Sequence, residues 1–273
     1  MTGLQGKRVL VTGAAGGIGL CTAEEFVRAG CAVIITDIDA ARLGDAGRKL
    51  AEHGGPVHTR VVDVTDEAQV KALARWVLED IGGLDVLVNN AGVGYSGELA
   101  ETTMETWQKL LAVNLLGPLY HIYAFLPHFK ERRAGHIVNV SSGQSYFRMP
   151  TWGAYASIKA AQGVFSEILH FELRKYGLKV TTVYPYMVNT PFYKNIQGQT
   201  WGGRLSMKLV PYYSMTPEKV ASIIFKAVKK GVKVERVSLI NDLGRYAQVV
   251  PFANDIMALT SNFFLAKKAN THA

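Results

Sequence analysis

Cysteine is scarce in this sequence. The 273 residues contain two cysteines, Cys21 and Cys31, which are too few for a disulfide framework or a cysteine-rich metal site. The seven histidines show no ligand pairing such as His-Glu-x-x-His, so we expect no metal site. Both cysteines are expected to be reduced packing residues, as in a cytoplasmic protein.

Long apolar runs are also missing. No segment reaches the roughly 18 uninterrupted apolar residues that a membrane-spanning helix needs, and residues 9–12 read as a buried strand rather than as part of a secretory signal. The apolar share of 48% is nevertheless sufficient for the core of one α/β domain. We therefore expect a cytoplasmic protein with a single domain over residues 1–273.

Acidic residues are outnumbered, and the excess of positive charge is local. The net charge is +8, and residues 201–273 alone hold eleven Lys/Arg against four Asp/Glu. Two interpretations stay open: a solvated face, or a surface that contacts anionic lipid or an acidic partner. Nucleic acid is not an expected partner, because helix-turn-helix, zinc-finger and aromatic RNA-binding signatures are all missing. The densest basic stretch contains Lys226, Lys229, Lys230, Lys233 and Arg236.

Short β-branched runs alternate with helix-period segments along almost the whole chain. Strands that are apolar throughout are typical of a parallel sheet with both faces covered, so the alternation predicts a doubly wound α/β fold of about seven strands with helices on both faces. Residues 186–215 have weak periodicity and are predicted to form a substrate loop over the carboxyl edge of the sheet, and residues 243–273 a C-terminal extension. The predicted strands are Arg8–Val11, Ala32–Thr36, Val57–Val62, Val86–Val88, His136–Val140, Lys179–Val183 and Val237–Ile240. The predicted helices include Ala68–Ile81, Thr106–Lys130, Ala156–Tyr176 and Pro217–Lys230.

Tyr155 and Lys159 are separated by one helical turn, and Ser142 precedes Tyr155 by thirteen residues. A phenol with a pKa near 10 is a poor proton shuttle at neutral pH, but a Lys ammonium at i+4 shares its helix face and favours the phenolate. The Ser142 hydroxyl could hold a carbonyl or alcohol oxygen against the phenol. Because an isolated Tyr-x-x-x-Lys is most often a surface pair, its meaning depends on the rest of the chain.

Glycines follow the first predicted strand directly. Gly13, Gly16, Gly17 and Gly19 stand between Thr12 and a helix that is predicted to begin near Ile18. Such glycines let the backbone approach a pyrophosphate closely, and the helix N-terminus supplies amide donors and a positive dipole end. The position between a strand and a helix predicts a dinucleotide site.

Asp37 ends the second predicted strand, about eighteen residues after Gly19. A carboxylate there is expected to bind the ribose hydroxyls of an adenosine and to repel a 2′-phosphate. No Arg or Lys occurs at 14–16 or 36–39, so the sequence favours NAD over NADP. The alternative role for Asp37 is the N-cap of a helix from Ala40, which Asp39 fits better.

Together these motifs resemble those of the short-chain dehydrogenase/reductase family, in order and spacing, over nearly the whole chain. The resemblance implies a single-domain Rossmann fold and catalytic roles for Asn114, Ser142, Tyr155 and Lys159. Asn114 would hold a water in a proton relay, and Lys159 would lower the Tyr155 pKa and bind the nicotinamide ribose. Implied cofactor contacts are Gly13, Gly16, Gly17, Ile18, Gly19, Asp37, Asp63, Val64, Asn90, Ala91, Gly92, Tyr155, Lys159, Pro185, Val188 and Thr190.

Within the family, several stretches are similar to the retinol and 17β-hydroxysteroid dehydrogenase-like branch: Ala124–Pro127, Gly135–Val138 and Val188–Phe192. That similarity implies a lipophilic substrate. The branch often carries an N-terminal membrane anchor, and this sequence shows none.

One departure from the family concerns the segment after the sixth strand. The family usually has Pro-Gly there, and this chain has Pro185-Tyr186. The loss of the glycine removes easy access to positive φ and brings an aromatic ring near the nicotinamide site. The Val188 backbone and the Thr190 hydroxyl remain candidate carboxamide partners. Tyr186 is expected either to wall the substrate pocket, with Gln144, Ser142 and Tyr155, or to anchor the loop.

The expected activity is NAD-dependent hydride transfer between a secondary alcohol and its carbonyl. Sugar-nucleotide epimerases share the glycine spacing but usually have a longer C-terminal domain, and an NAD-sensing binding protein has no need of Ser142, Tyr155 and Lys159 together. A serine hydrolase lacks its Gly-x-Ser-x-Gly elbow here. We also expect a homodimer or homotetramer, because the two longest predicted helices correspond to the family's four-helix contact, and a possible peripheral contact with a membrane.

Overall fold

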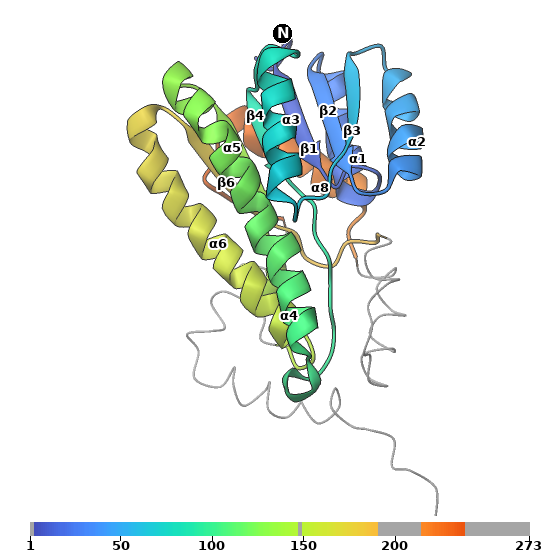
Figure 1. Ribbon diagram of the computed structural model, residues 1–273, viewed down its shortest axis with the longest axis vertical. Coiled ribbons are helices and arrows are strands. Elements are labelled where there is room, and N and C mark those ends of the chain that lie inside the picture. Colours follow the sequence, from blue (N-terminus) through green and yellow to red (C-terminus); the bar gives the residue numbers. More distant parts are fainter. Residues whose placement is uncertain (1–2, 147–148, 191–213, 238–273) are drawn as a thin grey trace, which may run out of the picture.

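The computed structural model describes residues 3–146, 149–190 and 214–237. These residues build a parallel sheet of seven strands in the order β3-β2-β1-β4-β5-β6-β7, with helices on both faces (Figure 1). The predicted doubly wound α/β fold is therefore confirmed. The strands are β1 Arg8–Thr12, β2 Ala32–Asp37, β3 Val57–Val61, β4 Val86–Asn89, β5 His136–Val140, β6 Lys179–Tyr184 and β7 Val234–Arg236. The α-helices are α1 Gly17–Arg28, α2 Ala40–Ala51, α3 Glu67–Glu79, α4 Met104–Leu111, α5 Gly117–Arg132, α6 Gly153–Leu173 and α8 Pro217–Lys230.

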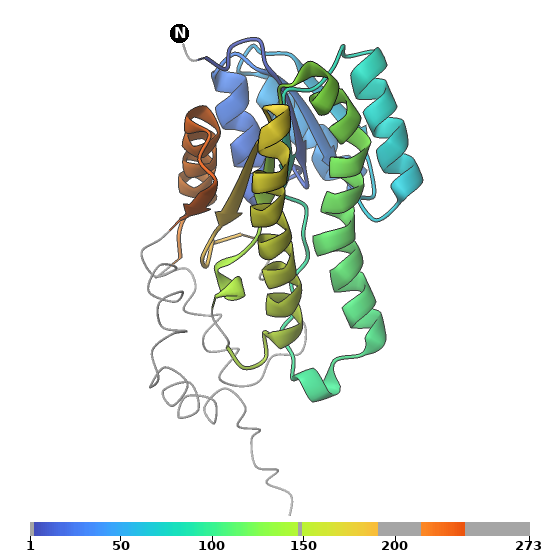
Figure 2. The same cartoon turned by 90° about the vertical axis from the view of Figure 1, so that its left-hand side faces the viewer.

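Alternate side chains of the central strands pack into two separate cores. Val9 and Val11 of β1 belong to the core under α1, α2 and α8, whereas Leu10 between them belongs to the core under α3, α5 and α6. The alternation follows from the two-residue repeat of a strand. Figure 2, turned by 90°, shows the helices of the two layers on opposite sides of the sheet.

The seventh strand lies earlier than predicted. The sequence predicted it at Val237–Ile240, and the structure has it at Val234–Arg236, where Val234 pairs with Thr182 of β6. Gly231 ends α8 with a φ of 69°, so the chain turns sharply and reaches the sheet edge within three residues. The later position was predicted from a β-branched run. The composition of that run does not determine the register of the strand, because the register is set by pairing with β6.

Aspartate caps fix where two helices begin. Asp39 accepts a hydrogen bond from the backbone N–H of Arg42 at the start of α2, and Asp66 accepts two at the start of α3. Asp39 is therefore the helix cap, as the sequence favoured, which leaves Asp37 available for another role.

A π-helix over Ala112–Leu116 joins α4 to α5 into one continuous helical run. The run Met104–Arg132 is long and apolar enough to cross a membrane by length and composition, with a mean hydropathy of 1.4 in its most apolar stretch. This is weak evidence for a membrane span, because core helices pass the same test. Phe125 and Phe129 of this run are fully buried against the sheet.

β1 lies between β2 and β4. The chain continues from β2 to β3 on one side of β1 and from β4 to β5 on the other side, so the strand order reverses at β1. Open α/β sheets bind ligands at the carboxyl ends of the strands at such a reversal. The predicted substrate loop meets this edge, but its residues 191–213 lie outside the described part. The predicted C-terminal extension 243–273 and the aromatic residues Phe192, Tyr193, Trp201, Tyr212 and Tyr213 lie outside it as well.

Candidate active site

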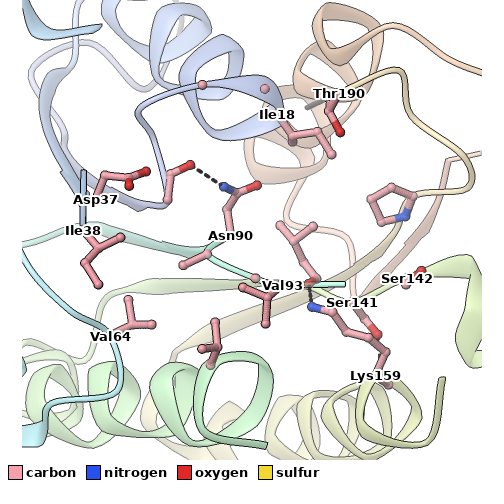
Figure 3. A pocket seen from close by; sticks show the side chains of 18 of the residues that line it. Ile18, Asp37, Ile38, Val64, Asn90, Val93, Ser141, Ser142, Lys159 and Thr190 are labelled. Atoms are coloured by element: carbon pink, nitrogen blue, oxygen red, sulfur yellow. Dashed lines mark hydrogen bonds between the residues drawn. The ribbon is translucent and has the colours of Figure 1, made fainter. Parts of the chain in front are cut away.

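A cavity of about 730 Å³ opens at this edge of the sheet. Figure 3 shows Asp37 at one end of it and Ser142 and Lys159 at the other. The structure thus brings together residues from seven segments that the sequence had predicted separately. The predicted site residues that line it are Gly13, Gly16, Gly17, Ile18, Asp37, Asp63, Val64, Asn90, Ala91, Gly92, Ser142, Tyr155, Lys159, Pro185, Val188 and Thr190.

The glycine loop is shaped for close approach of a ligand. Gly13 has a φ of 64°, and a Cβ on it would lie 2.7 Å from the Cα of Ala91. A Cβ on Gly19, which is buried below the loop, would lie 2.4 Å from the Gly13 carbonyl oxygen. α1 begins at Gly17 with no side-chain cap and no acidic residue in its first turn. Its first amides and positive dipole end therefore remain available for an anion, and the residues present fit the pyrophosphate of a dinucleotide.

The segment after β4 clamps this loop in place. The Asn90 side-chain nitrogen donates to the carbonyl oxygens of Thr12 (2.9 Å) and Gly13 (3.1 Å). The Thr12 hydroxyl accepts from the backbone N–H groups of Asn90 and Ala91, each at 3.0 Å. Asn90 thus acts by shaping the loop, a role that the family resemblance had described only as cofactor contact.

Asp37 lies where β2 ends, with its side chain at the cavity wall. One carboxylate oxygen accepts from the Ala15 N–H and the other from the Asp39 N–H, both at 3.1 Å. Each oxygen keeps acceptor capacity for a ribose hydroxyl. The carboxylate therefore ties β2 to the glycine loop and also faces the space where a ribose would lie.

Arg42 is a cavity residue that the sequence analysis missed. It lies in the first turn of α2 and lines the cavity, and one of its terminal nitrogens is 2.6 Å from the position of a Cβ on Gly16. The search for a basic residue covered positions 14–16 and 36–39, but a long side chain from the next helix reaches back to the same place.

Ser142 and Tyr155 meet at the other end of the cavity. Ser142 caps a short 3₁₀ turn, Gly143–Ser145, and its Oγ accepts from the Gln144 N–H at 3.2 Å. It is also hydrogen-bonded to the Tyr155 hydroxyl, which lowers the Tyr155 pKa, but burial has the larger effect and raises that pKa to about 12. Burial thus places the pKa of this phenol above its usual range, and a lowering of that pKa by Lys159 stays a prediction.

The Lys159 ammonium is held by two neutral acceptors. Its Nζ donates to the Val140 carbonyl oxygen at 2.9 Å and to the Gln162 Oε1 at 3.0 Å, so the ammonium is directed toward the end of β5. Burial lowers the Lys159 pKa to about 7. Val140 and Gln162 were not among the predicted site residues. Gln162 could have been noticed, since it is a polar residue three positions after Lys159 on the buried face of an apolar helix.

Asn114 is in the π-helix, where such irregular turns often mark functional sites. Its side chain is fully buried and does not line the cavity. Oδ1 accepts from the Val93 N–H, and Nδ2 donates to the carbonyl oxygens of Val93 and Leu110. The Asn114 side chain thus holds the segment after β4 against the helix, and its role in a proton relay stays a prediction.

Two of the four predicted substrate contacts, Gln144 and Tyr186, are not among the side chains that line the cavity in the described residues, whereas Ser142 and Tyr155 are. The Gln144 Nε2 donates to the Met149 sulfur at 3.8 Å. Met187, one residue after the position where the family usually has glycine, has a φ of 27° and lines the cavity. Hydrogen bonds between this segment and Met215 fix that path.

The family is decided by sequence comparison. A family model described as short chain dehydrogenase matches residues 7–201. The chain belongs to this family. The Rossmann fold implied by the resemblance is the one observed.

Among curated relatives, the chain is 38% identical over 240 residues to a probable oxidoreductase, EphD, of Mycobacterium tuberculosis. The match covers 84% of this chain and 40% of that protein, so this chain spans well under half the length of that relative.

Solved structures of the family superpose over most of the chain. A short-chain dehydrogenase/reductase from Burkholderia phymatum in complex with NAD has a TM-score of 0.83 and 26% identity, covering 95% of this chain and 97% of that one. An alcohol dehydrogenase from the archaeon Thermococcus sibiricus, complexed with 5-hydroxy-NADP, has a TM-score of 0.74 and 28% identity, covering 85% and 95%. Both of these neighbours are complexed with a nicotinamide dinucleotide or a derivative of one.

Proposed function

We propose that this protein interconverts a secondary alcohol and its carbonyl, with NAD as the hydride carrier and Tyr155 as the acid–base group. The observation that carries the proposal is the single cavity that holds the glycine loop at one end and the hydrogen-bonded Ser142 and Tyr155, with Lys159, at the other. An oxidoreductase of this family needs this combination of a dinucleotide cradle and a proton shuttle.

The chain's own residues supply orientation and proton transfer. Ser142 donates a hydrogen bond to the substrate oxygen and holds it against the phenol. Tyr155 takes the hydroxyl proton during oxidation and returns it during reduction, work that is typically worth about 10²–10⁴ in rate. Lys159 supplies the positive charge that favours the phenolate. A nicotinamide cofactor, when bound on the glycine loop, accepts or donates the hydride.

A preference for NAD over NADP is part of the proposal. Asp37 directs a carboxylate at the ribose position, and a carboxylate repels a 2′-phosphate. Arg42 opposes this preference, because its guanidinium lies near the same part of the cavity. The carboxylate is fixed by two backbone amides, whereas the Arg42 side chain is exposed, and we give Asp37 the greater weight.

A lipophilic substrate, such as a steroid-like or retinoid-like alcohol, fits the surroundings of Tyr155. The phenol belongs to an apolar cluster with Leu110, Trp152 and Ile158, and the Trp152 ring lies 5.8 Å from that of Tyr155. Val93 packs on this cluster and also lines the cavity. An apolar wall beside the proton shuttle favours substrates whose carbinol carbon is flanked by hydrocarbon.

Replacement of Tyr155 by Phe tests the mechanism. It keeps the ring in its cluster and removes the proton shuttle, so alcohol oxidation should fall by at least about a hundredfold while NAD binding persists. Turnover is followed by NADH absorbance across steroid, retinoid, long-chain and cyclic alcohols, and NAD binding by calorimetry. Tyr176→Phe, which removes a hydroxyl from a ring that stacks with Lys130 on the surface, is the matched control. Near-normal turnover in Tyr155→Phe would refute this mechanism.

A further inference from the structure

We propose that Gln162 is a positioning residue that holds the Lys159 ammonium in place beside Tyr155. The inference rests on the proposed function, since it concerns the charge that serves the proton shuttle. It assigns a role to a side chain that does not line the cavity and that acts through Lys159.

The first step is the set of partners around the ammonium. Lys159 is 3% exposed, and its Nζ has two hydrogen-bond acceptors in the described residues, the Val140 carbonyl oxygen and the Gln162 Oε1. An ammonium has three donors, so one N–H remains for the cavity that Lys159 lines. Both acceptors are neutral. The charged form of Lys159 is thus held without a carboxylate. Of the two acceptors, only the Gln162 Oε1 belongs to a side chain.

The second step is the absence of other charge near Lys159 among the residues that the structure describes. The Val140 carbonyl oxygen contacts the ammonium from the end of β5, and Ser141 donates to the Lys159 backbone carbonyl oxygen. A Cβ on Gly92 would lie 3.7 Å from Nζ and 2.9 Å from the Asn114 Oδ1. None of these residues is ionisable. On α6 itself the ionisable neighbour is Tyr155. The remaining charged side chains of the described cavity wall are Asp37, Arg42, Asp63 and Lys109.

The third step concerns the orientation of the Gln162 amide. Lys159 can only donate, so the Gln162 oxygen must face it and the amide nitrogen must face away. That nitrogen is buried and has no hydrogen-bond partner among the described residues. A side chain kept only for packing at this 1% exposed position would be apolar. The Gln162 amide nitrogen is left unpaired because the amide is oriented with its oxygen toward Lys159.

The expected consequence has a definite sign. Burial already lowers the Lys159 pKa to about 7. Loss of the Gln162 oxygen removes an acceptor that favours the charged form, so the pKa should fall further. At neutral pH a larger fraction of Lys159 is then neutral, and Tyr155 loses the positive charge that favours its phenolate.

The experiment compares Gln162→Met with Gln162→Glu. Met matches the length of Gln without an acceptor, and Glu keeps the oxygen. The Lys159 midpoint is measured by ¹³Cε NMR titration of lysine-labelled protein, with the signal assigned by its loss in Lys159→Met. Gln162→Met should lower the midpoint by about one pH unit or more and cut kcat for NAD-linked alcohol oxidation about tenfold. Gln162→Glu should leave the midpoint at or above that of the unmodified protein.

Ser166→Ala is the structural control. Ser166 lies one turn beyond Gln162 and accepts from Asn139 and Thr182, so its loss should lower the Tm without moving the Lys159 midpoint. An unchanged midpoint in Gln162→Met overturns the inference. If the unmodified protein oxidises no alcohol, or Tyr155→Phe is fully active, the proposed function fails instead, and the titration still decides the role of Gln162.

Discussion

At the scale of single residues, two side chains of opposite charge compete at the ribose end of the cavity. Asp37 is fixed by the backbone amides of Ala15 and Asp39, and Arg42 lies over Gly16 from the first turn of α2. A ribose with two free hydroxyls benefits from the carboxylate, whereas a 2′-phosphate would benefit from the guanidinium. The balance between them sets cofactor choice.

Substitution of these two residues should shift cofactor choice in opposite directions. Asp37→Ala should weaken NAD by about 1.5–3 kcal/mol, as for hydrogen bonds to a charged group, and improve NADP relative to NAD. Asp37→Asn, which keeps one acceptor without the charge, separates repulsion from loss of loop contacts. Arg42→Ala should weaken NADP and leave NAD nearly unchanged. Calorimetry with both cofactors measures this, with Asp45→Ala on the exposed face of α2 as control. An unmodified protein that prefers NADP would overturn the assignment.

How much of the site the sequence predicts depends on how local each interaction is. The glycine loop, Ser142, Tyr155 and Lys159 are recognisable because their spacing along one strand, turn or helix carries the chemistry. Arg42 and the Val140 carbonyl join the site through contacts between elements, and no local pattern encodes those. Gly163 on α6 is a further case in which a contact between elements decides the residue. In the structure a Cβ there would lie 2.6 Å from the Tyr184 hydroxyl, so packing within the subunit explains it.

At the scale of helices and strands, the sheet and its covering helices bury two histidines in neutral form. Burial lowers the pKa of His136 in β5 to about 3 and that of His121 in α5 to about 4. The His136 Nε2 bonds the Thr181 hydroxyl at 2.8 Å, and the His121 Nδ1 bonds the Gly117 carbonyl oxygen, also at 2.8 Å. In acid, an imidazole that is exposed to water binds a proton, and unfolding exposes both of these rings.

We therefore predict a loss of stability in mild acid. The folded pKa values lie below the unfolded value near 6.5, so the unfolded chain binds more protons at lower pH. The stabilisation is complete above about pH 6.5 and each histidine removes about 1.4 kcal/mol per pH unit as the pH falls toward its folded pKa. Urea unfolding at pH 7.5, 6 and 5 measures the slope, which His136→Gln should reduce. A free energy of unfolding that stays constant down to pH 5 would refute the prediction.

The helices α5 and α6 carry an apolar outer face. Val164, Ile168 and Phe171 of α6 are 61%, 51% and 58% exposed, and Tyr123 of α5 is 65% exposed. The spacing i, i+4, i+7 puts the three α6 residues on one side of the helix. Figure 1 shows both helices on the same outer layer of the molecule. Exposed apolar side chains gathered in this way favour contact with another subunit.

We propose a homodimer or homotetramer that uses this face. Light scattering at micromolar concentration should give at least twice the chain mass, and Val164→Asp with Ile168→Asp should yield a folded monomer, because burial of an unpaired charge is costly. Val61→Asp, at a 50% exposed position on the edge strand β3, is the control and should leave the assembly intact. A monomeric unmodified protein would reject the idea.

At the scale of the whole molecule, the topology was predictable and the strand register at the edge was not. Six strands agree with the sequence prediction to within a residue or so, because each is a buried β-branched run between turn residues. β7 differs because its position depends on pairing with β6 rather than on its own composition. The activity, the oligomeric state and the location of the protein depend on its surfaces and its partners. The shape and charge of those surfaces therefore bear on them more than local sequence pattern does.

We propose that this protein is cytoplasmic and that it meets an anionic membrane surface through the basic side of α8, where a lipophilic substrate would be delivered. Lys226, Lys229 and Lys230 are exposed on that helix, and Lys179 of the adjoining strand β6 is exposed as well. α8 covers the sheet face opposite α5 and α6, so membrane contact and subunit contact use different sides. The apolar C-terminal groups that would add to this contact, Val249–Phe252 and Asn262–Leu265, lie outside the described residues.

The basic side of α8 should make binding to liposomes dependent on salt. Each basic residue near an anionic leaflet contributes about 1 kcal/mol, so a cluster of four holds the protein reversibly, and salt screens the attraction. In sedimentation with phosphatidylserine vesicles, the protein should pellet at low salt and be released at high salt. Lys226→Glu with Lys229→Glu and Lys230→Glu should abolish binding, whereas Lys71→Glu with Arg75→Glu on α3, across the sheet, should not. Protein that stays in the supernatant at low salt and oxidises only small water-soluble alcohols would mean that these lysines form a solvated face and that the substrate arrives from solution.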